Sequence, residues 1–167
     1  MRHYLITFII LALFLGCEDD SIAAGTSPVL ALLPAEVTLS AGEDDHLALQ
    51  LTGLDADVFG ISLRISYNDA VVSFDDSTGF TLGDFFGPDI VSFVLVEASQ
   101  IYLTLTRTKG QAGRSGSGSL AVLAFTGESA GVTSVAIQGA QLRLYDMSGD
   151  VIDIADLVVE SALITVQ

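Results

Sequence analysis

Alternation of apolar and polar residues is the dominant pattern of the chain from residue 28 onward. Three segments alternate strictly, namely residues 46–51, 61–67 and 101–106. Because successive side chains of a β-strand point to opposite faces, this period of two predicts strands with one buried and one solvated face. Two further segments, 90–96 and 120–125, are apolar at nearly every position. We expect these two to be strands buried on both faces, or edge strands covered by loops.

Turn-forming residues separate these segments. Gly, Asp, Asn, Ser and Pro gather at residues 42–45, 53–55, 68–69, 75–79, 87–89 and 148–150. Short strands at a spacing of roughly ten residues, with no long helical pattern between them, predict an all-β fold, an antiparallel β-sandwich. One helical turn is expected within residues 153–160. Residues 110–119 contain four glycines and three serines, and this composition is typical of a mobile loop.

The first 17 residues have a different character. Arg2 precedes an apolar run at residues 4–15, which is shorter than the ~20 residues that a membrane-spanning helix requires. A short apolar run behind a positive charge is typical of a secretory signal peptide. The run ends in Leu-Phe-Leu-Gly-Cys at residues 13–17, and this ending resembles the lipobox of bacterial lipoproteins. The resemblance implies a signal peptide over residues 1–16 and lipidation of Cys17.

An ordinary signal peptide followed by an incidental cysteine is the alternative. Cys17 is the single cysteine of the chain, and it occupies the one position that this chemistry requires, which favours lipidation. Residues 17–27 are mostly acidic or small and predict a flexible tether, and residues 28–167 predict one domain. We therefore expect an exported protein that is lipid-anchored to the bacterial cell envelope, at the outer membrane or cell surface. Its contact with the membrane is expected through the lipid anchor only.

The composition excludes several function classes. The chain has 6 Lys and Arg residues against 21 Asp and Glu residues, which gives a formal net charge of −15. Nucleic-acid binding requires clustered basic residues, so no nucleic-acid partner is expected. A hydrophobic content of 50% argues against disorder of the whole chain.

Catalytic and metal-binding chemistry lack suitable residues. His46 is the single histidine outside the leader, so neither a Ser-His-Asp arrangement nor a zinc site is expected. The carboxylates lie in turns, with no aromatic-lined cleft of the kind a glycosidase needs. Residues 146–153 have spaced carboxylates but lack the terminal Glu of an EF-hand loop. A hairpin turn explains that segment better, although a bound ion is left open. We expect no enzyme activity, no metal and no cofactor.

Three phenylalanines gather in one turn-rich segment, at Phe80, Phe85 and Phe86. Two adjacent aromatic side chains cannot both point inward in a regular strand. One interpretation is that they cap the open end of the sandwich. The other is that they form an exposed aromatic anchor at the rim of an interface.

The order of several segments resembles that of a cohesin domain, the β-sandwich module that binds dockerins in bacterial polysaccharide-degrading assemblies. Residues 58–69 resemble the "G-x-x-x-x-x-x-Y-D-P" strand and turn of the family, and residues 116–125 resemble its "G-x-G-x-L-A-x-x-x-F" strand. The opening turn at 34–43 and the turn at 146–150 before a closing strand fit the same order. The resemblance covers residues 28–167. It implies a nine-stranded jelly roll with a flat sheet face that recognises a protein partner.

That face would include the strands at residues 60–67, 101–106 and 141–145. The alternation assigns its outward side chains to Ser62, Arg64, Ser66, Tyr102, Thr104, Thr106, Gln141, Arg143 and Tyr145. The inward side chains would be Ile61, Leu63, Ile65, Leu103 and Leu105.

The leading hypothesis is thus a non-catalytic cohesin-like interaction module that binds a dockerin-type protein, with a link to polysaccharide degradation left open. We expect the partner's complementary surface to be neutral to basic, because the chain is acidic. A carbohydrate-binding module of the same jelly-roll architecture is the alternative. It would need a row of exposed aromatic side chains, for which Tyr102 and Tyr145 are the outward candidates. A structural envelope or adhesion domain without a specific partner is a third hypothesis.

Overall fold

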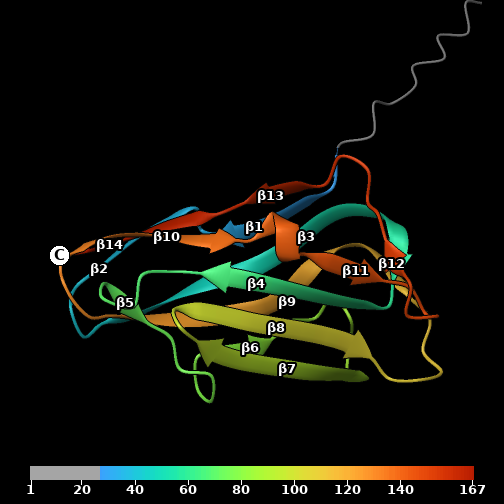
Figure 1. Ribbon diagram of the computed structural model, residues 1–167, viewed down its shortest axis with the longest axis horizontal. Coiled ribbons are helices and arrows are strands. Elements are labelled where there is room, and N and C mark those ends of the chain that lie inside the picture. The colour runs from blue at the N-terminus through green and yellow to red at the C-terminus, as the bar shows by residue number, and fades with distance from the viewer. Residues whose placement is uncertain (1–26) are drawn as a thin grey trace, which may run out of the picture.

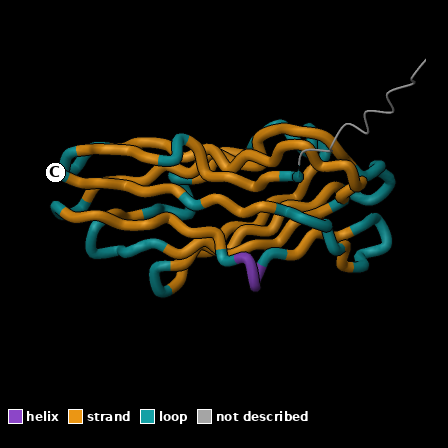
Figure 2. Tube along the Cα trace, turned by 90° about the horizontal axis from the view of Figure 1, so that it is seen from above, coloured by secondary structure: helices purple, strands orange, loops and turns teal. Residues whose placement is uncertain are grey.

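The computed structural model describes residues 27–167. The signal peptide, Cys17 and all but the last residue of the tether lie outside the described residues. The described chain forms fourteen β-strands and one short 3-10 turn, η1 (Gly139–Gln141). Figure 2 shows the strands running along the long axis of the molecule, with η1 projecting from one side. Within residues 27–167, no helix is long and apolar enough to cross a membrane.

The strands form two sheets packed face to face (Figure 1). The first sheet consists of β13 (Val158–Glu160), β1 (Val29–Leu33), β3 (Asp44–Val58), β9 (Arg114–Gly127), β5 (Val72–Ser73) and β6 (Phe80–Leu82). The second consists of β12 (Val151–Ile152), β11 (Arg143–Tyr145), β4 (Gly60–Ser66), β10 (Gly131–Ile137), β14 (Ala162–Val166), β2 (Glu36–Leu39), β8 (Gln100–Arg107) and β7 (Ile90–Glu97). The predicted all-β sandwich is confirmed.

The number and direction of the strands differ from the expectation of nine antiparallel strands. Two pairs are parallel, β1 with β13 and β2 with β14. Several strands are short because the chain leaves one sheet for the other: β1 lies in the first sheet and β2 in the second, with Pro34 and Ala35 between them. Proline has no N–H to donate to a ladder, so a break at that position is expected.

The core lies between the two sheets, and the alternating pattern places its side chains correctly. Leu47, Leu49 and Leu51 are at most 1% exposed. All five residues expected to point inward from the second sheet are buried as well, namely Ile61, Leu63, Ile65, Leu103 and Leu105. The period of two therefore identified which face of β3, β4 and β8 meets the opposite sheet.

Three local expectations were wrong. Residues 153–160 form a loop and the short strand β13 instead of a helical turn. Most of the segment expected to be a mobile loop, from Arg114 to Ser119, belongs to β9, where pairing with β3 orders its glycines and serines. The apolar segment at residues 90–96 belongs to β7, which among the described strands pairs with β8 alone and lies at the edge of its sheet. It is neither buried on both faces nor covered.

Candidate partner-binding face

The outer face of the second sheet brings together the side chains expected to bind a partner. In the register between β4 and β8, Ser62 lies opposite Thr104 and Arg64 lies opposite Tyr102. On the other side of β4, Arg143 of β11 is also the partner of Ser62. Directly opposed residues of neighbouring strands point to the same face, so these side chains form one continuous surface. It extends over β11, β4 and β8, which lie side by side in Figure 1.

β7 adds an apolar row to this surface that the sequence analysis did not assign to it. Val91, Phe93 and Leu95 are 56%, 58% and 40% exposed. They lie opposite Thr106, Thr104 and Tyr102 of β8 and therefore share the outer face. We call the outer face of β11, β4, β8 and β7 the candidate face. A contiguous row of exposed apolar side chains is typical of a protein interaction site.

The centre of the candidate face is hollowed, with a cavity of about 220 Å³. Its lining includes Ser62, Arg64, Phe93, Tyr102, Thr104 and Gln141, five of which the sequence analysis had placed on this face. The hydroxyl of Thr104 donates a hydrogen bond to that of Ser62 at 3.2 Å. The hollow therefore combines hydroxyl groups, one cation and one exposed aromatic ring.

Arg64 and Tyr102 form a cation–π pair in this hollow. The guanidinium carbon lies 4.5 Å from the centroid of the Tyr102 ring. Such stacking holds a planar cation in place while its edge stays available to other groups. The same contact covers one face of the Tyr102 ring. Tyr102, one of the two outward candidates for carbohydrate stacking, therefore has one ring face occupied by Arg64.

A second hollow of about 400 Å³ lies at one end of the candidate face. Thr104 and Thr106 of β8 line one side, and Tyr145 and Met147 line the other, with Gly60 between them. Met147 is 68% exposed. A Cβ on Gly60 would approach the Thr106 hydroxyl oxygen at 3.2 Å, so the absence of a side chain there lets β4 and β8 keep this arrangement.

The remaining predicted residues of the face lie near its margins. Ser66 accepts a hydrogen bond from Gln138 Nε2 at 2.7 Å. Gln141 ends the turn η1 and is not part of a strand, because β11 begins only at Arg143. Arg143 donates through Nη1 to the carbonyl oxygens of Leu142 at 2.7 Å and Ala140 at 3.1 Å. The third predicted strand of the face is therefore shorter than expected.

The acidic segment at residues 146–153 contains a hairpin turn, as the sequence indicated. β11 and β12 pair antiparallel, with Tyr145 opposite Val151. The Oδ1 atom of Asp146 accepts hydrogen bonds from the backbone N–H groups of Ser148 at 2.8 Å and Asp150 at 2.9 Å. These bonds explain the position of Asp146 without an ion. Within residues 27–167, no three His, Cys, Asp or Glu side chains come together as metal ligands.

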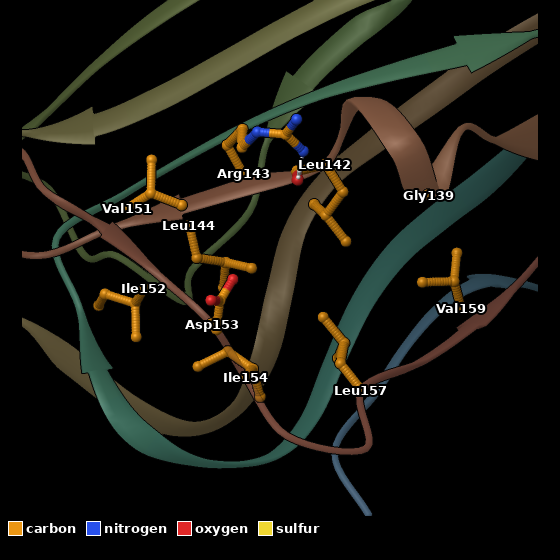
Figure 3. Close-up of a pocket in the computed structure, with 10 residues that line it drawn as sticks. All are labelled: Gly139, Leu142, Arg143, Leu144, Val151, Ile152, Asp153, Ile154, Leu157 and Val159. Atoms are coloured by element: carbon orange, nitrogen blue, oxygen red, sulfur yellow. Dashed lines mark hydrogen bonds between the residues drawn. The ribbon is translucent and has the colours of Figure 1, made fainter.

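A third cavity, of about 300 Å³, lies between the β11–β12 hairpin and β13 (Figure 3). Half-buried aliphatic side chains that pack against the core line it, among them Leu142, Ile154 and Leu157. In Figure 3 the guanidinium of Arg143 lies on the other side of β11 from Ile154 and Leu157. Asp153 is the one carboxylate among the described residues that line this cavity, so it does not provide the facing pair of acids of a glycosidase.

Phe85 and Phe86 are both buried, at 4% and 2% exposure, with ring centroids 4.9 Å apart in an edge-to-face arrangement. This burial agrees with the capping interpretation and excludes an exposed anchor at these two residues. Both can point inward because the loop at residues 83–89 is not a regular strand. Phe93 is instead an exposed aromatic side chain on the candidate face.

His46 and Tyr67 are two further titratable side chains to consider as site residues. His46 is exposed on β3 near Asp44 and Asp75. Tyr67 packs edge-on against Phe125, with centroids 5.7 Å apart. Burial raises the pKa of the Tyr67 hydroxyl, and the nearby Asp69 carboxylate raises it further. Tyr67 therefore stays protonated and acts as a packing residue.

No protein-family model and no curated protein matches the chain, whereas solved structures do. A non-cellulosomal cohesin from the hyperthermophilic archaeon Archaeoglobus fulgidus matches with a TM-score of 0.67 at 19% identity, over 85% of this chain and 92% of that chain. The chain has the cohesin fold.

Two bacterial structures show the same likeness. CaCohA2 from Clostridium acetobutylicum matches with a TM-score of 0.66 at 21% identity, over 86% of this chain and 92% of that one. The third cohesin ScaC from Acetivibrio cellulolyticus, solved in complex with the ScaB dockerin, has a TM-score of 0.67 at 14% identity, over 83% and 98% of the two chains. The resemblance found in the sequence is thus confirmed at the level of the cohesin fold.

Proposed function

We propose that this protein is a non-catalytic interaction module that binds a dockerin-type protein through the candidate face. The observation that carries the proposal is the apolar row Val91, Phe93 and Leu95 beside the hollow that contains Arg64 and Tyr102. Interfaces typically combine aromatic, aliphatic and arginine anchors with a polar surrounding. A face of four neighbouring strands is large enough for a standard interface, which buries about 800 Å² on each partner.

The fold supports the choice of partner class. The third cohesin ScaC was solved with the ScaB dockerin, and a Clostridium thermocellum structure is a type I cohesin–dockerin complex. Fold alone does not fix function, so the exposed apolar row beside the central hollow is the independent support. We also propose that the dockerin-type partner belongs to a polysaccharide-degrading system.

The binding test uses the purified full chain and every dockerin module encoded in the same genome. We expect at least one dockerin to bind in biolayer interferometry with a dissociation constant of about 1 μM or lower. Insoluble polysaccharide is tested in parallel at high salt, and the protein is expected in the flow-through. Retention on polysaccharide together with no dockerin binding would overturn the proposal in favour of a carbohydrate-binding module.

We propose in addition that Cys17 anchors the protein to the cell envelope through its acyl chains. More than one acyl chain makes such anchoring stable. Membrane fractionation tests this step: the native chain should remain with the membrane, and Cys17→Ser should appear in the soluble exported fraction. A Cys17→Ser chain that stays with the membrane would contradict the anchor without affecting the binding proposal.

A further inference from the structure

Arg64 differs from the other arginines of the described chain in having no hydrogen bond. Arg107 donates to the Ala112 carbonyl and to Gln111, Arg114 donates to the Phe85 carbonyl, and Arg143 donates to two carbonyls near η1. Within residues 27–167, the Nε–H groups of Arg64 and Arg107 are both buried without a partner, but Arg107 donates through its two Nη atoms. Within the described residues, the one electrostatic contact of the Arg64 guanidinium is the cation–π stack on the Tyr102 ring.

The surroundings of Arg64 hold its guanidinium ready for a ligand. The Tyr102 ring lies at 4.5 Å and restricts the guanidinium plane. The hydroxyl groups of Ser62 and Thr104 are in the same hollow, and Phe93 forms part of its wall. A side chain that enters this hollow therefore meets one fixed cation, two hydroxyl groups and an exposed aromatic ring.

The charge of the protein makes an unpaired arginine at this place informative. The chain has 21 acidic residues and a net charge of −15, yet no carboxylate lines the hollow around Arg64 in the described structure. An arginine in so acidic a protein has many potential intramolecular partners. Its position without one leaves the strongest donor of the candidate face for an external acceptor, and a carboxylate matches the guanidinium geometry best.

We propose that Arg64 binds a carboxylate of the docked protein, an Asp or Glu side chain that enters the central hollow beside an apolar residue packed on Phe93. The inference rests on the proposed function, because it assigns the chemistry of the partner at the same face. It replaces the sequence-based expectation of a neutral to basic partner surface. That expectation followed from the negative net charge of the whole chain, whereas the charge at the centre of the candidate face is positive because of Arg64.

The test is an NMR titration of the ¹⁵N-labelled full chain, in a neutral detergent, with two blocked dipeptides. The probes are acetyl-Phe-Asp-amide and acetyl-Phe-Asn-amide, which differ only in the carboxylate. We expect saturable shifts of the Arg64 side-chain N–H and of Tyr102 with the Asp peptide, and at least tenfold weaker binding of the Asn peptide. Arg64→Gln should abolish this preference and bring the two affinities together.

Lys109→Gln is the matched control, because it removes one positive charge from an exposed loop position outside the hollow. It should leave the preference for the Asp peptide intact. Equal binding of the two peptides by the native chain, or a preference that survives in Arg64→Gln, would overturn the inference. If a dockerin binds but the Asp and Asn peptides bind equally, the proposed function holds and the carboxylate site is wrong. If the Asp peptide binds more tightly but no dockerin binds, the carboxylate site holds and the proposed function is wrong.

Discussion

At the scale of single residues, glycine decides how closely the aromatic loop approaches the first sheet. A Cβ on Gly83 would lie 2.1 Å from the carbonyl oxygen of Ser119. The backbone N–H of Gly83 donates to the Leu120 carbonyl at 3.0 Å, and that of Phe85 donates to the Ser119 carbonyl at 2.9 Å. This close approach directs Phe85 and Phe86 into the core.

Gly83→Ala should therefore be strongly destabilising. The added methyl group meets backbone atoms, which cannot move aside as the end of a flexible side chain can. We expect a loss of about 3 kcal/mol or more in the free energy of unfolding, measured by urea titration. Gly139→Ala is the control, because a Cβ there meets nothing within 4 Å, and its effect should be within ~0.5 kcal/mol. Similar effects of the two substitutions would contradict this account.

Asp75 is a residue whose contribution to stability should depend on pH. Its Oδ1 atom accepts hydrogen bonds from the hydroxyl and the backbone N–H of Ser77 and from the backbone N–H of Thr78. The Ser77 bonds, and then those of Thr78, lower the pKa of the Asp75 carboxyl. A folded-state pKa below the unfolded one gives stability that is present above the unfolded pKa and is lost as pH falls through the folded pKa.

Asp75→Ala should accordingly unfold at a lower urea concentration than the native chain at pH 7. The gap between the two midpoints should narrow as pH falls from about 4, the ordinary pKa of Asp, through the lowered folded pKa. Asp76→Ala removes a neighbouring exposed carboxylate and serves as the control. A midpoint gap for Asp75→Ala that stays constant from pH 7 to pH 3 would show that the ionised carboxylate is not the stabilising form.

At the scale of elements, the β7–β8 hairpin contains a strained turn. Ala98 and Ser99 link the two strands with φ angles of 50° and 60°. Two consecutive positive φ values are typical of a type I′ turn, for which Asn-Gly is the preferred sequence. Side chains with a Cβ are disfavoured in this conformation. The turn sets the register that places Phe93 opposite Thr104.

Replacing Ala98-Ser99 by Asn-Gly should stabilise the protein by about 1 kcal/mol, because the new residues adopt the required conformation with less strain. The measurement is the free energy of unfolding in urea. Ser148→Gly lies in another hairpin turn, without a positive φ at that residue, and should not stabilise. A neutral or destabilising Asn-Gly double variant would contradict the assignment of strain to this turn.

The elements also show which features a sequence predicts. Alternation identified the buried and exposed faces of β4 and β8, because a period of two fixes side-chain direction without knowledge of the pairing. It failed for β7, since a segment apolar on both faces is compatible with burial as well as with an exposed edge. The pairing distinguishes the two possibilities: β8 is the one neighbour of β7 among the described strands, and this leaves Phe93 exposed. The Gly- and Ser-rich part of β9 was missed because its order comes from pairing with β3.

At the scale of the whole molecule, the net charge of −15 is a source of self-repulsion in the folded state. Salt screens this repulsion, with a Debye length of about 10 Å at 0.1 M. The melting temperature should therefore rise when NaCl is increased from about 0.02 to 0.3 M. Differential scanning calorimetry measures the shift. A melting temperature that falls over this range would mean that attractive ion pairs outweigh the repulsion.

The central claim is that the candidate face is the surface that binds the partner, and a matched pair of variants tests it most directly. Phe93→Asp and Val132→Asp each replace an apolar side chain, 58% and 57% exposed, by the same carboxylate. Val132 belongs to β10, outside the four strands of the candidate face. With a dockerin bound by the native chain, Phe93→Asp should weaken the affinity about 30-fold, the loss typical of an interface anchor, and Val132→Asp should leave it unchanged. Equal affinities of the native chain and Phe93→Asp would contradict the account.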